Sequence, residues 1–253
     1  MKTFSKDKLT VKIMDTRSEM GDVAAKDIHD EIISLLSVKD EINMIFAAAP
    51  SQNDVLASLV AYRDIDWARV NAFHMDEYIG LAPELKDKSF STYLTDHIFS
   101  KLPFRSVNLI DSTATDSDRE CNRYTKLLKE NPTDIVVMGI GENGHIAFND
   151  PWIAKFDDEE TVKVVPLDEV CRQQQVNDGC FADIDLVPTH AISLTCPTLA
   201  AGGALFCIVP APTKAAAVKR TLEGEISEEC PATILRRHEK ACLYLDKDSS
   251  ALL

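Results

Sequence analysis

A histidine stands between two candidate hydrogen-bonding partners in a glycine-rich segment near the middle of the chain. The segment reads Gly-Ile-Gly-Glu-Asn-Gly-His-Ile-Ala-Phe-Asn-Asp-Pro (139–151) and follows an apolar run that ends at Met138. An imidazole exchanges protons near neutral pH, and a partner on one ring nitrogen leaves the other nitrogen free for chemistry. Single histidines are commonly structural, but this placement predicts that His145 transfers protons with Asn143 and Asp150 as its orienting partners.

Two adjacent carboxylates, Asp76 and Glu77, follow a second apolar run at residues 69–73. Successive side chains of a strand point to opposite faces, so both cannot serve one pocket while the chain stays extended. We expect one of the two to be a base and the other to be structural or solvent-facing. The alternative is that the two acids only form a turn at the end of the strand.

Candidate phosphate ligands occur where further apolar runs meet the start of a helix. Ser51, Gln52 and Asn53 lie at one such start, where free amides and the positive end of the helix dipole bind anions. An ordinary helix cap is the alternative there. Lys214 lies in the first turn of another helix, where a cation is unfavourable unless it pairs with an anion. Arg172 is a further candidate, with a solvated helix face as its alternative.

The glycine-rich segment also matches the pattern G-x-G-x-x-G, which is typical of dinucleotide sites. Pro151 would interrupt a helix that started there. No Asp or Glu stands at the end of a second strand about 20 residues further on, where dinucleotide sites have one. The glycines, Gly144 among them, would let the backbone approach any phosphate or sugar. The spacing is therefore weak evidence for a dinucleotide site.

Short apolar runs alternate with segments of helical periodicity along the whole chain. Strands are predicted at Leu9–Met14, Ile42–Ala47, Arg69–Phe73, Val107–Ile110, Asp134–Met138, Val162–Val165, Ala191–Leu194, Ala204–Val209 and Ala241–Leu245. Helices are predicted at Ser18–Leu36, Asn53–Tyr62, Ser89–Leu102, Ser117–Glu130, Asp168–Val176 and Thr213–Glu223. This alternation predicts one α/β domain over residues 1–253, in which helices cover both faces of a mostly parallel sheet. Active sites of such sheets lie beyond the carboxyl ends of the strands.

Composition restricts the partners and the compartment. The 253 residues contain no apolar run near the roughly 18 that a membrane span needs, and the first residues lack the apolar stretch of a signal peptide. The seven cysteines favour reduced thiols over disulfides or structural zinc. A net charge of −14 repels nucleic acid and anionic membranes. We expect a cytoplasmic protein that binds a small molecule.

Three motifs together resemble the glucosamine-6-phosphate deaminase (isomerase) family. They are Phe-His-Met-Asp-Glu-Tyr-Ile-Gly-Leu (73–81), the segment 139–151 and Pro-Thr-Lys-Ala (212–215). The resemblance covers nearly the whole chain. It implies a Rossmann-like three-layer α/β/α sandwich, an amino-sugar phosphate as substrate and no metal or cofactor. Homo-oligomers occur in the family.

The resemblance also implies a role for each matching residue. Asp76 would move a proton between C2 and C1 of the open-chain sugar, and His145 would open the pyranose ring. Lys214 would bind the phosphate. Asn143 and Asp150 stand where the family commonly has Asp and Glu, so one charge is lost and one side chain is shorter by a methylene. The segment of hexameric members that binds N-acetylglucosamine 6-phosphate is absent after Pro151, so we expect no such regulation.

Three alternatives stay open. Galactosamine 6-phosphate differs from the first substrate at one stereocentre. A 6-phosphogluconolactonase would share the fold and the histidine, but its typical Asp-Glu-Arg and Gly-His-Thr motifs are replaced here by Asp-Glu-Tyr (76–78) and Gly-His-Ile (144–146). A sugar-phosphate sensor without catalysis would fit the two exchanged residues, yet it would not need Asp76 and His145.

Overall fold

Apolar runs of four to six residues form the centre of a sheet that is covered on both faces. The computed structural model describes residues 1–82 and 84–253, and its main sheet has eight strands in the order β1-β2-β11-β10-β7-β3-β4-β6. These are β1 (Lys2–Lys6), β2 (Leu9–Ile13), β3 (Ile42–Phe46), β4 (Val70–His74), β6 (Ser106–Asn108), β7 (Ile135–Met138), β10 (Ala204–Val209) and β11 (Ala241–Leu245). β1 is antiparallel to β2, and the other neighbouring pairs are parallel. The predicted mostly parallel sheet is confirmed.

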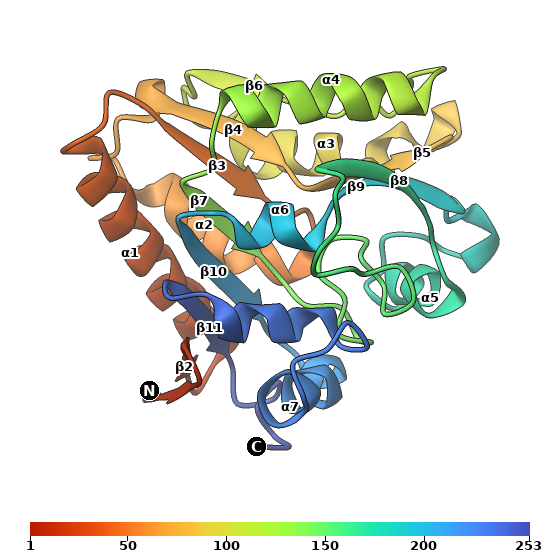
Figure 1. Ribbon diagram of the computed structural model, residues 1–253. Coiled ribbons are helices and arrows are strands. Elements are labelled where there is room, and N and C mark those ends of the chain that lie inside the picture. The colour runs from red at the N-terminus through yellow and green to blue at the C-terminus, as the bar shows by residue number, and fades with distance from the viewer.

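Helices pack on the two faces of this sheet and complete three layers (Figure 1). One apolar core joins the sheet to α1 (Arg17–Leu36), α2 (Asn53–Ala61) and α3 (Phe90–Leu94), and the other joins it to α4 (Ser117–Glu130), α6 (Cys196–Ala200) and α7 (Ala215–Glu223). Alternate residues of one strand enter different cores: Ile135 and Val137 face the first, and Val136 and Met138 the second. This alternation of fully buried positions is why the strands read as continuous apolar runs. The Rossmann-like α/β fold is therefore as predicted.

A second, antiparallel sheet of three strands was not expected. It has the order β5-β9-β8 and comprises β5 (Asp76–Ile79), β8 (Val162–Pro166) and β9 (His190–Leu194). The segments predicted at 162–165 and 191–194 are strands, but they belong to this small sheet. β5 begins with two acids and escapes a search for apolar runs, and its backbone pairs with β9 in the register Asp76↔Ser193.

Two predicted helices have different boundaries. The segment predicted at Ser89–Leu102 is the short α3 followed by a π-helical turn at Thr95–Phe99. The helix predicted from Thr213 begins as one 3₁₀ turn at Pro212–Lys214, and α7 proper starts at Ala215. The remaining helix, α5 (Glu169–Asn177), lies beyond the arrowheads of the parallel strands, on the right in Figure 1.

A buried histidine fixes the end of β4, directly before Asp76. The Nε2 atom of His74 accepts a hydrogen bond from the Ile110 amide at 2.8 Å. Burial lowers the pKa of His74 to about 3, so the ring stays neutral and serves as a fixed acceptor. The Tyr124 hydroxyl bridges the same region, because it accepts the His74 amide at 3.0 Å and donates to the His74 carbonyl at 2.9 Å. The end of this strand is thus held from two sides.

Over the described residues, no helix has the length and apolar character needed to cross a membrane. All seven cysteines are free thiols, and five of them are buried.

Candidate active site

A cavity opens at the carboxyl ends of β3, β4, β7 and β10, where the sequence predicted a site. The segments that follow these strands line it through Ala47–Gln52, Met75 and Asp76, Gly139–Gly141 with His145, and Pro210, Ala211, Thr213 and Lys214. Arg17 of α1 and Gln174, Gln175 and Asp178 in and after α5 complete the wall. Polar groups from six parts of the chain therefore meet in one cavity.

Asp76 faces this cavity from the first position of β5. Its side chain accepts no hydrogen bond from the described residues, although only 7% of the residue is exposed. Burial raises the pKa of Asp76 well above its ordinary value, and the nearby charge of Glu77 raises it further. A carboxylate that is desolvated and unpartnered is a stronger base than one in water, which suits proton abstraction from carbon.

Glu77 points away from the cavity and has a structural role. It is fully buried, and its carboxylate accepts the amides of Tyr78 at 2.9 Å, Phe90 at 3.1 Å and Ser91 at 2.8 Å. The last two amides are free donors at the start of α3, so Glu77 caps that helix. The two adjacent acids thus have separate roles, as the alternation of strand side chains predicted.

His145 is oriented by the two residues that the sequence placed beside it. Its Nδ1 atom lies 2.8 Å from Oδ1 of Asn143 and 3.1 Å from Oδ1 of Asp150. The Asn143 amide also donates to Asp150 at 2.8 Å, which locks the three side chains together. Two acceptor oxygens assign the proton to Nδ1. Nε2 makes no hydrogen bond within the described part of the chain, so it is left for a ligand in the cavity.

The shorter side chain of Asp150 still reaches the imidazole. Burial by itself would raise the pKa of Asp150, but the hydrogen bonds from His145 and Asn143 lower it below its ordinary value. The carboxylate therefore stays ionised beside the ring. An ionised partner stabilises an imidazolium formed during proton transfer, even though Asn143 contributes no charge of its own.

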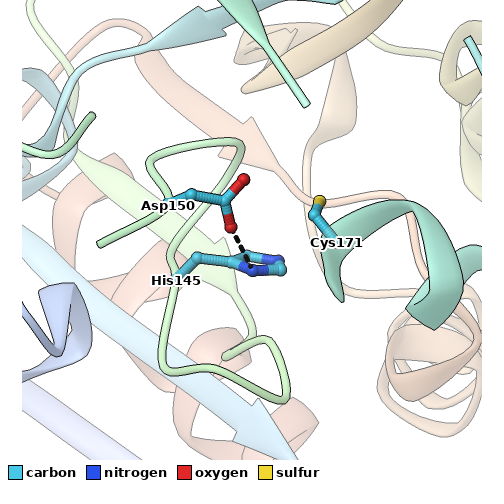
Figure 2. Close-up of side chains that lie close together, drawn as sticks. All are labelled: His145, Asp150 and Cys171. Carbon is cyan, nitrogen blue, oxygen red and sulfur yellow. Dashed lines mark ion pairs between the residues drawn. The ribbon is translucent and has the colours of Figure 1, made fainter. Parts of the chain in front are cut away.

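Cys171 of α5 lies near this pair. Figure 2 shows its sulfur across from Asp150 and from the edge of the imidazole, and one ligand atom from each residue lies within 4.8 Å of the others. Such a set could hold a divalent ion. Burial raises the pKa of the Cys171 thiol well above its ordinary value, and Nδ1 of His145 is already hydrogen-bonded. An ion would have to displace the thiol proton and, unless it bound at Nε2, the imidazole proton as well.

A second group of residues in the cavity wall is suited to an anion. Lys214 is 5% exposed and its ammonium group has no hydrogen-bond acceptor among the described residues. Burial lowers its pKa, while the charges of Asp178 and Glu142 act in the opposite direction. Ser51 and Gln52 line the same cavity, and the Gln52 amide donates to Ser51 Oγ at 3.0 Å. A bound anion would supply the partner that Lys214 lacks.

Three of the predicted ligands lie outside the cavity wall. The exposed Asn53 accepts a hydrogen bond from the Tyr93 hydroxyl. Gly144 adopts a left-handed conformation with φ of 91°, and a Cβ there would lie 2.6 Å from Cys230 Sγ, so it serves the loop's own packing. Arg172 donates to the carbonyls of Ile184 at 2.6 Å and Val187 at 3.1 Å.

The position of Arg172 outside the wall has a geometric cause. At about 100° per residue, Gln174 lies on the opposite side of the helix from Arg172, and the guanidinium group of Arg172 is held by the carbonyls of Ile184 and Val187, whereas Gln174 and Gln175 line the cavity. Gln174 accepts the Glu142 amide at 2.9 Å, and Gln175 accepts the Tyr78 hydroxyl at 2.8 Å. Sequence reasoning missed both glutamines.

Ala211, in the cavity wall, has a backbone conformation that is normally reserved for glycine. Its φ of 82° and ψ of 148° cost of order 1–3 kcal/mol for a residue with a Cβ. We expect Ala211→Gly to raise the free energy of unfolding by about 1 kcal/mol, measured by urea denaturation, because relief of strain exceeds the added entropy of the unfolded chain. Ala57→Gly, on the exposed side of α2, is the matched control and should lower stability by about 0.5–1 kcal/mol. An equal loss of stability in both variants would contradict backbone strain at Ala211.

Comparison with known proteins identifies the family of the chain. A family model described as glucosamine-6-phosphate isomerases/6-phosphogluconolactonase matches residues 15–244. The chain belongs to this family. A glucosamine-6-phosphate deaminase of Listeria monocytogenes serovar 1/2a (strain ATCC BAA-679 / EGD-e) is 34% identical over 223 residues, which cover 88% of this chain and 93% of the relative. A protein of the same name from Bacillus cereus (strain G9842) is 32% identical over 244 residues, 96% of this chain and 89% of that one.

Solved structures of the family have the same fold. A monomeric glucosamine-6-phosphate deaminase superposes with a TM-score of 0.86 at 28% identity, over 96% of this chain and 99% of the other. A 6-phosphogluconolactonase from Thermotoga maritima superposes with a TM-score of 0.76 at 18% identity, over 94% and 100% of the two chains. At that identity the second likeness concerns the fold alone.

Proposed function

We propose that the protein converts glucosamine 6-phosphate and water into fructose 6-phosphate and ammonia. The observation that carries this proposal is the pairing, in one cavity, of a buried base, Asp76, with an oriented imidazole, His145, and a buried cation, Lys214. The names of the relatives in Listeria and Bacillus support the same reaction. The roles below belong to this proposal.

Ring opening requires one proton to move between two oxygens of the sugar. Nε2 of His145 takes the proton of the C1 hydroxyl and delivers it to the ring oxygen as the bond between C1 and that oxygen breaks. The imidazole is positively charged between these two events. Asp150 stabilises that charge through Nδ1, from which it lies 3.1 Å away.

Isomerisation requires a base that removes a proton from C2 and returns it to C1. Asp76 abstracts the C2 proton from the open-chain aldehyde, while a proton of the C2 ammonium group passes to the C1 oxygen, which leaves an enolamine with a hydroxyl on C1 and an amino group on C2. Return of the proton to C1 converts C2 into an iminium carbon. Water adds at C2 to give a carbinolamine, the carbon–nitrogen bond breaks, and ammonia leaves with a ketone at C2. A positioned carboxylate can carry out the proton transfers without a cofactor.

The phosphate group of the substrate would bind to Lys214, Ser51 and Gln52 in the cavity wall. Lys214 supplies a positive charge, and Ser51, Gln52 and the free amides of their helical turn supply hydrogen bonds. Gly139 lets this turn come close, because a Cβ there would lie 3.2 Å from Gln52 Nε2 and 3.4 Å from Ser51 Oγ. A charged phosphate ester does not cross a bilayer unaided, so we place the reaction in the cytoplasm.

Ammonia release from a panel of sugar phosphates tests the proposal. Purified protein is incubated with glucosamine 6-phosphate, galactosamine 6-phosphate and 6-phosphogluconolactone, and ammonia, fructose 6-phosphate and acid are measured separately. We expect ammonia and fructose 6-phosphate in equal amounts from the first substrate. Hydrolysis of the lactone without ammonia release would favour a lactonase. Binding of the sugars without turnover of any would favour a sensor.

A further inference from the structure

The cavity wall contains a cation that neither the sequence motifs nor the family resemblance indicated. We propose that Arg17 is a second ligand of the substrate phosphate and that it fills the role that the sequence suggested for Arg172. The proposal rests on the proposed function, because it assigns the phosphate of that substrate to this part of the cavity wall. In the described part of the cavity wall, Arg17 and Lys214 are the two side chains with a permanent or near-permanent positive charge.

Arg172 lies outside the cavity wall, where backbone carbonyls hold its guanidinium group. Nη2 donates to the carbonyls of Ile184 at 2.6 Å and Val187 at 3.1 Å, and Nε lies 3.3 Å from the Val187 carbonyl. These bonds tie α5 to the turn that follows it. Arg172 would therefore have to leave these carbonyls to bring its Nε and Nη2 donors to an anion in the cavity.

Arg17 is held in place but keeps free donors. Nε donates to Oδ2 of Asp54 at 2.6 Å, and Nη2 donates to the carbonyl of Pro50. Nη1 has no acceptor among the described residues, and 39% of the side chain is exposed. A guanidinium has five N–H donors in a rigid fork, so a fork fixed on one edge is preorganised to bind an oxyanion with the other.

The position of Arg17 in its helix also calls for an anion. It is the first residue of α1, where the helix dipole is positive, and α2 starts beside it with its own free amides. Asp54 compensates one positive charge. A phosphate dianion placed among Arg17, Lys214 and the turn Pro50–Gln52 would compensate the rest, and the contact from Arg17 to Pro50 links the cation to that same turn.

The rival explanation is that Arg17 only braces α1 against α2 through Asp54. Binding of inorganic phosphate, followed by isothermal titration calorimetry, separates the two roles without requiring turnover. Arg17→Met should weaken phosphate binding by about tenfold or more, since a partly buried charge-assisted bond is lost. The phosphate affinity of Arg17→Lys should lie between those of Arg17→Met and wild type, because lysine keeps the positive charge but lacks the forked donors of the guanidinium group. Asp54→Asn removes the brace but keeps the cation, and should weaken binding less than threefold.

Arg172→Met and Arg69→Met are the matched controls. Arg69 also donates to backbone carbonyls, at a site remote from the cavity, and neither control should weaken phosphate binding more than threefold. With glucosamine 6-phosphate as substrate, Arg17→Met should raise KM at least tenfold and change kcat little. Equal losses in Arg17→Met and Asp54→Asn, or unchanged phosphate binding in Arg17→Met, would overturn the assignment. Weaker phosphate binding in a protein that never releases ammonia would uphold Arg17 and refute the proposed function.

Discussion

Asp76→Asn is expected to lower kcat/KM by about 10²–10⁴-fold and, at the same time, to stabilise the folded protein at pH 8. The loss of activity follows because an amide cannot take the C2 proton, whereas the shape of the cavity is kept. The gain in stability follows because the mutation removes a carboxylate that is buried without a hydrogen-bond partner among the described residues. An ordinary core substitution would change both quantities in the same direction.

The gain in stability should depend on pH with a definite sign. Burial raises the folded pKa of Asp76 above that of the unfolded chain. The folded state therefore binds a proton more tightly, and wild type loses stability as pH rises from the unfolded pKa through the folded pKa. The amide of the variant cannot ionise, so the stability difference between variant and wild type should be small near pH 4, grow with pH and level off above the folded pKa. Each unit of pKa shift corresponds to about 1.4 kcal/mol.

Urea denaturation at a series of pH values measures this difference, and ammonia release measures activity. Asp96→Asn is the control, because Asp96 is exposed and its replacement should leave both the activity and the pH profile of stability close to wild type. A destabilised Asp76→Asn variant at pH 8 would show that the carboxylate is stabilised by a partner. Retained activity would remove Asp76 from the mechanism.

The central sheet could be predicted from the sequence because its strands are buried on both faces. Runs such as Ile42–Phe46 and Ala204–Val209 are apolar at every or nearly every position, so no register needs to be known to recognise them. β5 and β1 could not be recognised this way. β5 begins with Asp76 and Glu77, whose burial depends on a cavity and on the cap of α3, both of which are formed by residues distant in sequence.

The site was predictable where its residues follow strands and less so elsewhere. Asp76, His145 and Lys214 all come soon after a strand of the main sheet, and parallel strands bring their carboxyl ends to one edge. Gln174 and Gln175 lie on a helix, and their orientation depends on how α5 is docked, which the sequence does not encode locally. Arg17 did carry a signal, since the dipole argument used for Lys214 applies equally to a cation at the start of α1.

Gly141→Ala is expected to inactivate the enzyme through His145 alone. A Cβ at Gly141 would lie 2.1 Å from Cε1, 2.3 Å from Nε2 and 2.4 Å from Nδ1 of the imidazole. The loop cannot easily yield, because the Gly141 amide donates to the His145 carbonyl at 2.9 Å and the Gly144 amide to the Gly141 carbonyl at 3.0 Å. The ring must therefore move by about 1 Å or more, and displacement of a catalytic group by that distance costs on the order of a hundredfold in kcat/KM.

A double-mutant cycle with His145→Ala identifies the cause of this loss. If the new methyl group acts by displacing the ring, then His145→Ala provides the space that it needs, and the double variant should be no less active than His145→Ala by itself. Inorganic phosphate should bind Gly141→Ala within threefold of wild type, because the closest contacts of the Cβ at Gly141 are with the His145 ring and not with Lys214 or Ser51. Losses that multiply in the double variant would mean that Gly141→Ala distorts the loop beyond His145. In that case the glycine would be required for the backbone of the loop as a whole rather than for the approach of one imidazole.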